Sequence, residues 1–264
     1  MKTYTWLLAA VLFCNAGIAN ANCYDACDPC SECDPCCDWS LNVSADYLYW
    51  KVNRSDLDLS DESGFICPDY DHGFRIAAFL PTECWEVGAR YTYFKTTHSI
   101  DEEKYGIDLD VVDLEARYTW TLDCADVLFR PFMGTKLAWI VEKFDGNKNN
   151  YKGFGIYIGT ESEWHVYDMC DTAISFVTRG AFGVMDGRHR TEINDKVKEC
   201  IFHPYYEVFA GVKLNMGEFC GFMSPDILIG YEAQNWQDFR EFWNENDIAS
   251  MGLGGLVVRI GTEF

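Results

Sequence analysis

Cysteine is the residue type in this chain with the most potential chemistry, at 13 of 264 residues. Six cysteines fall in the acidic segment 22–38, where four read C-x2-C-x2-C-x3-C from Cys27 onward. That spacing matches a bacterial [4Fe–4S] ferredoxin run, but Asp38 stands where such a run has proline. Zinc suits paired Cys-x2-Cys ligands, yet the segment has no histidine. We favour disulfides over both, and predict no cofactor and no metal site.

Export of the chain is the reason for favouring disulfides. Lys2 precedes a short apolar run over residues 6–13, and Ala19-Asn20-Ala21 forms a small-x-small cleavage site, which is typical of a secretory signal peptide. Exported cysteines meet an oxidising compartment. Cys14 leaves with the signal, and twelve disulfide candidates remain: Cys23, Cys27, Cys30, Cys33, Cys36, Cys37, Cys67, Cys84, Cys124, Cys170, Cys200 and Cys220.

Histidines give no second chemical signal. None of the five has a serine, cysteine or carboxylate at the spacing of a nucleophilic triad. His189, between Arg188 and Arg190, is the best local candidate, and we interpret it as a solvated basic loop tip within reach of lipopolysaccharide phosphates. The sequence therefore predicts no catalytic residues and no enzyme.

The elements that carry these residues alternate apolar and polar side chains with a period of two, which indicates β-strands. The pattern recurs about ten times, near 39–53, 74–80, 85–95, 108–121, 127–142, 153–167, 172–186, 200–215, 226–235 and 250–264. Several segments are far longer than the 5–6 residues usual for globular strands. We predict an all-β fold: a transmembrane antiparallel up-and-down β-barrel of about ten strands, with eight or twelve as alternatives. No apolar stretch of about 18 residues follows the signal, so no transmembrane helix is expected.

The alternation assigns side chains to two faces of the wall. The lipid-facing row is expected to hold Tyr91, Tyr93, Tyr118, Trp120, Ile156 and Ile158. The lumen row is expected to hold Glu86, Arg90, Glu115, Arg117, Arg130, Lys136, Glu161 and Arg179. Phe264 ends the last strand as the terminal aromatic typical of outer-membrane barrels, and we interpret it as the insertion signal.

The organisation is thus a signal peptide over 1–21, a cysteine-rich periplasmic extension over 22–38, and a barrel over 39–264. Both termini would be periplasmic, with longer connections outside, one of them over 144–152. Cys84, Cys124, Cys170 and Cys220 would then lie in periplasmic turns. Aromatic residues reach 16% although mean hydropathy is only −0.16, as suits a barrel. The net charge of −21 argues against nucleic acid as a partner.

The stretch Ala45-Asp46-Tyr47-Leu48-Tyr49-Trp50-Lys51, the exported cysteine-rich chain and Phe264 together resemble a known family. It is the major outer membrane protein-like, pore-forming family of Legionella and Chlamydia-related bacteria, and the likeness covers roughly residues 39–264. The chain departs from the family in being short and in its cysteine cluster at 22–38. The family supplies no catalytic residues.

The resemblance implies a bacterial outer-membrane porin for small hydrophilic solutes that is also disulfide cross-linked in the cell envelope. The alternative is a closed structural or adhesive barrel without a conducting pore, and an outer-membrane enzyme ranks below both. Expected partners are outer-membrane lipid, lipopolysaccharide and other cysteine-rich envelope proteins, with a homo-oligomer as a further option.

Overall fold

The computed structural model describes residues 40–54, 69–82, 85–100, 103–122, 126–144, 146–169, 172–191, 201–217, 223–240 and 248–264. The predicted signal peptide, the segment 22–38 and every disulfide candidate lie outside these ranges. Within the described ranges, no helix is long and apolar enough to cross a membrane.

One antiparallel sheet contains all the described strands. They are β1 (Asn42–Arg54), β2 (Asp71–Thr82), β3 (Trp85–Ile100), β4 (Glu103–Tyr118), β5 (Trp120–Leu122), β6 (Val127–Phe144), β7 (Asn147–Met169), β8 (Thr172–Thr191), β9 (Ile201–Asn215), β10 (Ser224–Arg240) and β11 (Ile248–Glu263). The short β5 continues β4 beyond Thr119, and both pair with β6, so the wall has ten strands. The prediction of a ten-stranded antiparallel barrel is confirmed.

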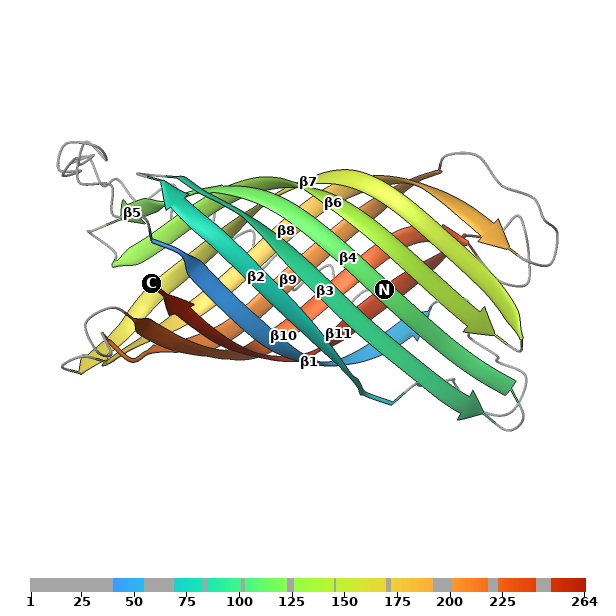
Figure 1. The fold of residues 1–264 in the computed structure, drawn as a ribbon, viewed down its shortest axis with the longest axis horizontal. Coiled ribbons are helices and arrows are strands. Elements are labelled where there is room, and N and C mark those ends of the chain that lie inside the picture. Colours follow the sequence, from blue (N-terminus) through green and yellow to red (C-terminus); the bar gives the residue numbers. More distant parts are fainter. Residues whose placement is uncertain are drawn as a thin grey trace.

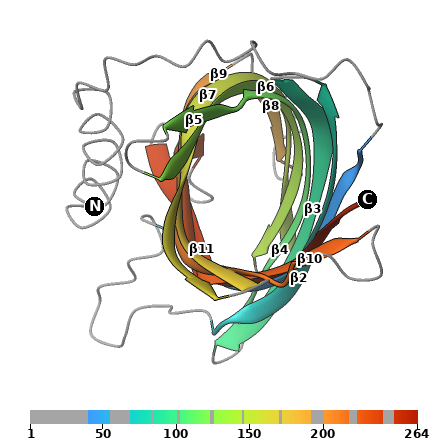
Figure 2. The same cartoon turned by 90° about the vertical axis from the view of Figure 1, so that its left-hand side faces the viewer.

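The sheet closes on itself between the first and the last strand. The first strand, β1, pairs with both β2 and the last strand, β11, while β4 pairs with β6 (Figure 1). Beyond the β1–β11 ladder, the backbone N–H groups of Leu41 and Phe264 each donate to the other residue's carbonyl oxygen at 3.1 Å. The wall is therefore continuous, and Figure 2 shows the ring of strands end-on.

The strands extend further than the sequence pattern indicated, at the end away from Phe264. β6 and β7 pair as far as Phe144 and Asn147, and Gly146 turns the chain with a φ of 79°. The expected long outer connection over 144–152 is therefore wrong, because most of it belongs to β7. Its Asn, Lys and Gly residues suggested a loop, but pairing with both neighbouring strands holds them in the sheet.

Apolar side chains cover the outer wall. Among the most exposed are Ile156 at 65%, Ile260 at 63% and Leu114 at 52%, on three different strands. Such a surface suits the hydrocarbon core of a bilayer, where closed barrels have no unpaired strand edge. Of the residues assigned to this face from the sequence, Trp120, Ile156 and Ile158 are exposed and Tyr91, Tyr93 and Tyr118 are half-buried.

The alternation reverses partway along β4. Up to Val111, apolar residues such as Tyr105 and Ile107 are buried inside the barrel, while Asp108 lies on the outer wall. From Val112 onward the order is opposite, because Asp113 and Glu115 point inward and Leu114 points outward. The reversal marks the level at which the strand leaves the apolar belt. Beyond that level the barrel has a mainly apolar interior and a polar outer face.

Candidate functional site in the barrel interior

All eight residues expected in the lumen lie on the inner side of the wall. Five of them are buried: Arg90, Glu115, Lys136, Glu161 and Arg179. Glu86, Arg117 and Arg130 line a cavity at the end of the barrel where the chain ends, together with Arg90 and Glu161. The structure joins most of them in one network of ion pairs.

Arg179 lies at the centre of that network. Its guanidinium contacts Glu115 through Nη2–Oε2 at 2.6 Å and Nη1–Oε1 at 3.2 Å, a bidentate geometry. Its Nε donates to Glu207 Oε1 at 3.0 Å, and its Nη1 lies 3.6 Å from Glu161 Oε2. The face of the same guanidinium lies 3.8 Å from the centroid of the Phe132 ring. One cation therefore links three carboxylates that come from different strands.

Arg90 and Lys136 extend the network around Asp113. Arg90 Nε donates to Asp113 Oδ2 at 3.1 Å, and Lys136 Nζ lies 2.6 Å from Asp113 Oδ1. Arg90 Nη2 also lies 3.6 Å from Glu207 Oε2, which connects this group to Arg179. Charges buried this deeply require partners. Cations and carboxylates from different strands therefore pair with each other across the lumen.

A second group of ion pairs joins β1, β2, β10 and β11. Arg75 contacts Glu232 through two bonds of 2.8 Å and reaches Asp46 at 3.3 Å. Arg259 Nε donates to the other oxygen of Asp46 at 2.8 Å. Asp46 thus bridges two arginines. These ion pairs inside the barrel connect the strands on both sides of the β1–β11 closure.

Several residues of these networks were absent from the sequence-based set. They are Asp46, Arg75, Asp113, Glu207, Glu232 and Arg259. Alternation alone could identify Asp113 as a lumen residue, because it lies two residues before Glu115 and therefore on the same face of the strand. Arg75 belongs to the shortest expected strand, and Glu207 to one where the alternation is loose. For those two, only the observed pairing register shows which carboxylate meets which arginine.

Apolar side chains fill the interior on the other side of the ion pairs, away from Phe264. Trp50, Tyr205 and Trp236 are each at most 1% exposed and belong to one cluster of buried residues. Phe94, Tyr105, Ile107, Ile140, Tyr151, Met185, Met251 and Leu253 are further members. Inward-facing glycines make room for the rings, since a Cβ on Gly153 or Gly187 would overlap Tyr151. This half of the interior is packed like the core of a soluble protein.

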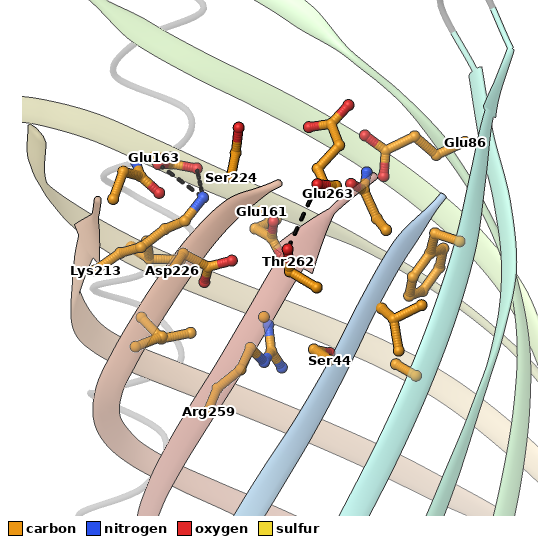
Figure 3. Close-up of a pocket in the computed structure, with 18 of the residues that line it drawn as sticks. Ser44, Glu86, Glu161, Glu163, Lys213, Ser224, Asp226, Arg259, Thr262 and Glu263 are labelled. Atoms are coloured by element: carbon orange, nitrogen blue, oxygen red, sulfur yellow. Dashed lines mark hydrogen bonds and ion pairs between the residues drawn. The ribbon is translucent and has the colours of Figure 1, made fainter. Parts of the chain in front are cut away.

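A cavity of about 450 Å³ opens at the end of the barrel where β1 begins and β11 ends. Lys213 Nζ lies 3.3 Å from Glu163 at its wall, and Figure 3 shows both side chains directed toward each other. Arg130 contacts Glu161 at 3.0 Å and Glu163 at 3.3 Å. The lining mixes both signs of charge and ends at the ion-pair networks. The cavity is a vestibule at one end of the barrel.

His189 is not the loop tip expected from the sequence. It lies in β8 with an inward side chain that is 2% exposed, and its Nε2 is 3.2 Å from His203 Nε2. His203 Nδ1 is 3.1 Å from the carbonyl oxygen of Gln237. The alternation in β8 explains the difference, because Arg188 and Arg190 point outward and the residue between them points inward. The described residues contain no group of three or more side chains placed to hold a metal ion.

Comparison with solved structures finds similar outer-membrane proteins at low identity. The outer membrane protease OmpT from Escherichia coli has a TM-score of 0.47 and 7% identity, covering 85% of this chain and 96% of that chain. The translocator domain of the autotransporter NalP from Neisseria meningitidis has a TM-score of 0.42 and 12% identity, covering 85% and 88%. Neither likeness is close enough to transfer an activity.

Comparison with curated proteins found no match. Comparison with family models found the Legionella pneumophila major outer membrane protein precursor family over residues 33–242. That match spans most of the chain, including β1 to β10. The chain belongs to this Legionella major outer membrane protein family, and it is an outer-membrane β-barrel.

Proposed function

We propose that this outer-membrane barrel is a closed structural component of the cell envelope and does not conduct solutes. The observation that carries the proposal is the filled interior. Ion pairs around Arg179 cross the lumen, and the apolar cluster around Trp50 and Trp236 occupies the half beyond them. In this proposal the barrel has no catalytic role.

Barrel size supports this proposal over the porin that the family resemblance implied. Barrels of about eight strands are filled by their own side chains, whereas porins with 16–18 strands leave an aqueous channel. Ten strands lie near the filled end of this range. Trp50, Tyr205 and Trp236 contribute large rings to the filled half.

The vestibule does not change this assignment. Its lining includes Arg130, Glu163 and Lys213 but none of the three large rings of the apolar half. A solute entering from the end near Phe264 would meet buried, mutually paired charges at the level of Arg90 and then the apolar cluster. Removing those charges from their partners costs several kcal/mol per ion.

A liposome-swelling assay tests the proposal. Vesicles that contain the folded protein should swell in isotonic sugar no faster than protein-free vesicles, while a general porin in parallel vesicles should allow rapid swelling. Swelling that falls with the size of the sugar would demonstrate a size-selective pore and would support the porin instead.

We further propose that the cysteines link the barrel to other envelope proteins. The strand ends that flank Cys84, Cys124, Cys170 and Cys220 in the sequence lie at the same end of the barrel as Asn42 and Phe264. These thiols therefore belong to segments that start and finish on one side of the membrane. The extension over 22–38, with its six cysteines, precedes β1 at that end.

A further inference from the structure

A cluster of cations lies on the outer wall at the end of the barrel away from Phe264. It comprises Lys143 on β6, Lys148 and Lys152 on β7, and Arg188 and Arg190 on β8, and all five are exposed. These three strands are neighbours in the sheet. We call this surface the basic face. Figure 1 shows the connected ends of β6 and β7, which carry Lys143 and Lys148, at its right-hand side.

The strand register places like charges side by side. Lys143 is directly opposite Lys148, and Lys152 is directly opposite Arg188. Side chains at opposed positions on neighbouring strands have Cβ atoms about 4.5–5.5 Å apart, and like charges there destabilise the sheet. For Lys152 and Arg188, an anion lying over the pair would relieve this repulsion.

Nearby carboxylates neutralise only part of this charge. Asp108 lies 3.4 Å from Lys143 but also 3.2 Å from Lys95, so it is shared between two cations. Asp186 lies on the same face as Arg188, two residues earlier in β8. Among the described residues, no carboxylate forms an ion pair with Lys152 or Arg188. The chain as a whole carries a net charge of −21, so this surface runs against its overall charge.

The height of the basic face on the wall points to a membrane ligand. Trp139 is opposite Lys152, and Phe154, which is 51% exposed, is the next outward residue of β7 toward the apolar belt. Ile156 and Ile158 continue that belt. Lys152 and Arg188 therefore lie directly beyond the surface that contacts hydrocarbon, at the level of lipid headgroups. Basic residues at this level attract anionic headgroups.

We propose that the basic face binds the phosphorylated headgroup of a lipid A-type glycolipid in the outer leaflet, with Lys152 and Arg188 as the central contacts. Arginine and lysine are the side chains that recognise phosphate. Acyl chains of the same lipid would lie along Phe154 and Ile156, below the headgroup. The proposal rests on the placement of the barrel in the outer membrane with this end outward; it does not depend on whether the lumen conducts.

A titration of the full-length, detergent-folded protein with bisphosphorylated lipid A tests the site. Each cation contributes about 1 kcal/mol near an anionic surface, or about fivefold, so the double variant Lys152→Gln/Arg188→Gln should bind about thirtyfold more weakly. Lys51→Gln is the matched control, because Lys51 points outward from β1 on the opposite wall. It should bind like the unmodified protein. Heat-dependent migration on gels should show that all variants are folded.

Three results would overturn the proposal. One is equal affinity of the double variant and the unmodified protein. Another is equal affinity for dephosphorylated lipid A, which would show that acyl chains alone bind. The third is equal affinity for phosphatidylglycerol, which would show a general anionic surface.

Orientation is tested separately with an epitope inserted at Gly146, where the chain turns in open space. The epitope should bind antibody on intact cells. If it binds only after permeabilisation, the outer-leaflet site is overturned whatever the affinity. Conductance of the same samples bears on the closed barrel alone, so failure of that proposal remains distinguishable.

Discussion

At the scale of single residues, the interior is held by ion pairs whose central members are buried. Arg179 contacts Glu115 and Glu207 within 3.2 Å and is itself 5% exposed. An ion pair of this kind is weak support for stability as a whole, but loss of one partner leaves the other charge buried and uncompensated.

Substitution of Arg179 by alanine should therefore destabilise the barrel by about 3–5 kcal/mol. Lys95→Ala is the control, since Lys95 is half exposed in its pair with Asp108 and exposed pairs contribute at most about 1 kcal/mol. Urea unfolding in detergent, followed by tryptophan fluorescence, measures both changes. Similar losses for the two variants would show that the Arg179 network does not stabilise the folded barrel.

The sequence predicts whether a side chain points inward or outward better than it predicts which residue forms an ion pair with it. Arg90, Glu115 and Arg179 were placed on the inner row by alternation alone, and the structure places them there. Ion-pair partners depend on how far neighbouring strands are offset along the barrel. They also join strands that are far apart in the chain, as Arg75 and Glu232 show. The prediction of a loop tip at His189 is wrong because β8 extends through this residue, so that Arg188 and Arg190 point outward and His189 points inward.

At the scale of elements, long strands such as β4 and β7 have a segment on the apolar belt and a segment that extends beyond it. In β4 the boundary lies between Val111 and Val112. On one side of it the inward row is apolar, and on the other side the inward row is charged. Ten segments were identifiable from the sequence because alternation is strong within the belt. The ends of the strands away from Phe264 cannot be identified in this way. There the apolar row faces inward and the polar row faces outward, which is the reverse of the pattern within the belt.

The boundary predicts a position-dependent cost for new charges on the outer wall. Leu114→Arg, inside the belt, should destabilise the barrel by about 2–4 kcal/mol. Thr97→Arg, on the exposed outer wall beyond the belt, should change stability by less than about 1 kcal/mol. Unfolding of both variants in lipid vesicles measures the difference, and equal costs would place the belt boundary elsewhere.

Closure of the barrel predicts an effect of removing Phe264. Its N–H and C=O form the last two backbone hydrogen bonds with Leu41, and its ring is half exposed at the rim. We expect deletion of Phe264 to reduce the folded barrel in isolated outer membranes, while Phe264→Tyr, which keeps a terminal aromatic, should retain most of it. Heat-dependent migration quantifies the folded fraction. Normal assembly of the deletion variant would rule out Phe264 as the insertion signal.

At the scale of the whole molecule, the barrel combines a membrane-facing wall, a filled interior and a vestibule at the end near Phe264. The fold follows from the sequence pattern, because a closed antiparallel wall is the only way these strands avoid unpaired edges in lipid. Whether the lumen is open does not follow from that pattern. It depends on how residues such as Trp50 and Trp236 pack across the lumen.

The cysteines give a prediction at the same scale. Envelope preparations run without reductant should contain high-mass species that collapse to the monomer when reductant is added, because in our proposal the cysteines form disulfides with other envelope proteins. Deletion of residues 22–37 should change the pattern of these species and leave the barrel folded. A single monomer band without reductant would exclude cross-linking.

Single-channel recording in a planar bilayer tests the closed barrel most directly. The unmodified protein should insert without stepwise conductance. The triple variant Trp50→Ala/Tyr205→Ala/Arg179→Ala removes two large rings and the central cation, and should produce steps if it remains folded by gel migration. Stable, stepwise conductance from the unmodified protein would contradict the account and identify an open pore.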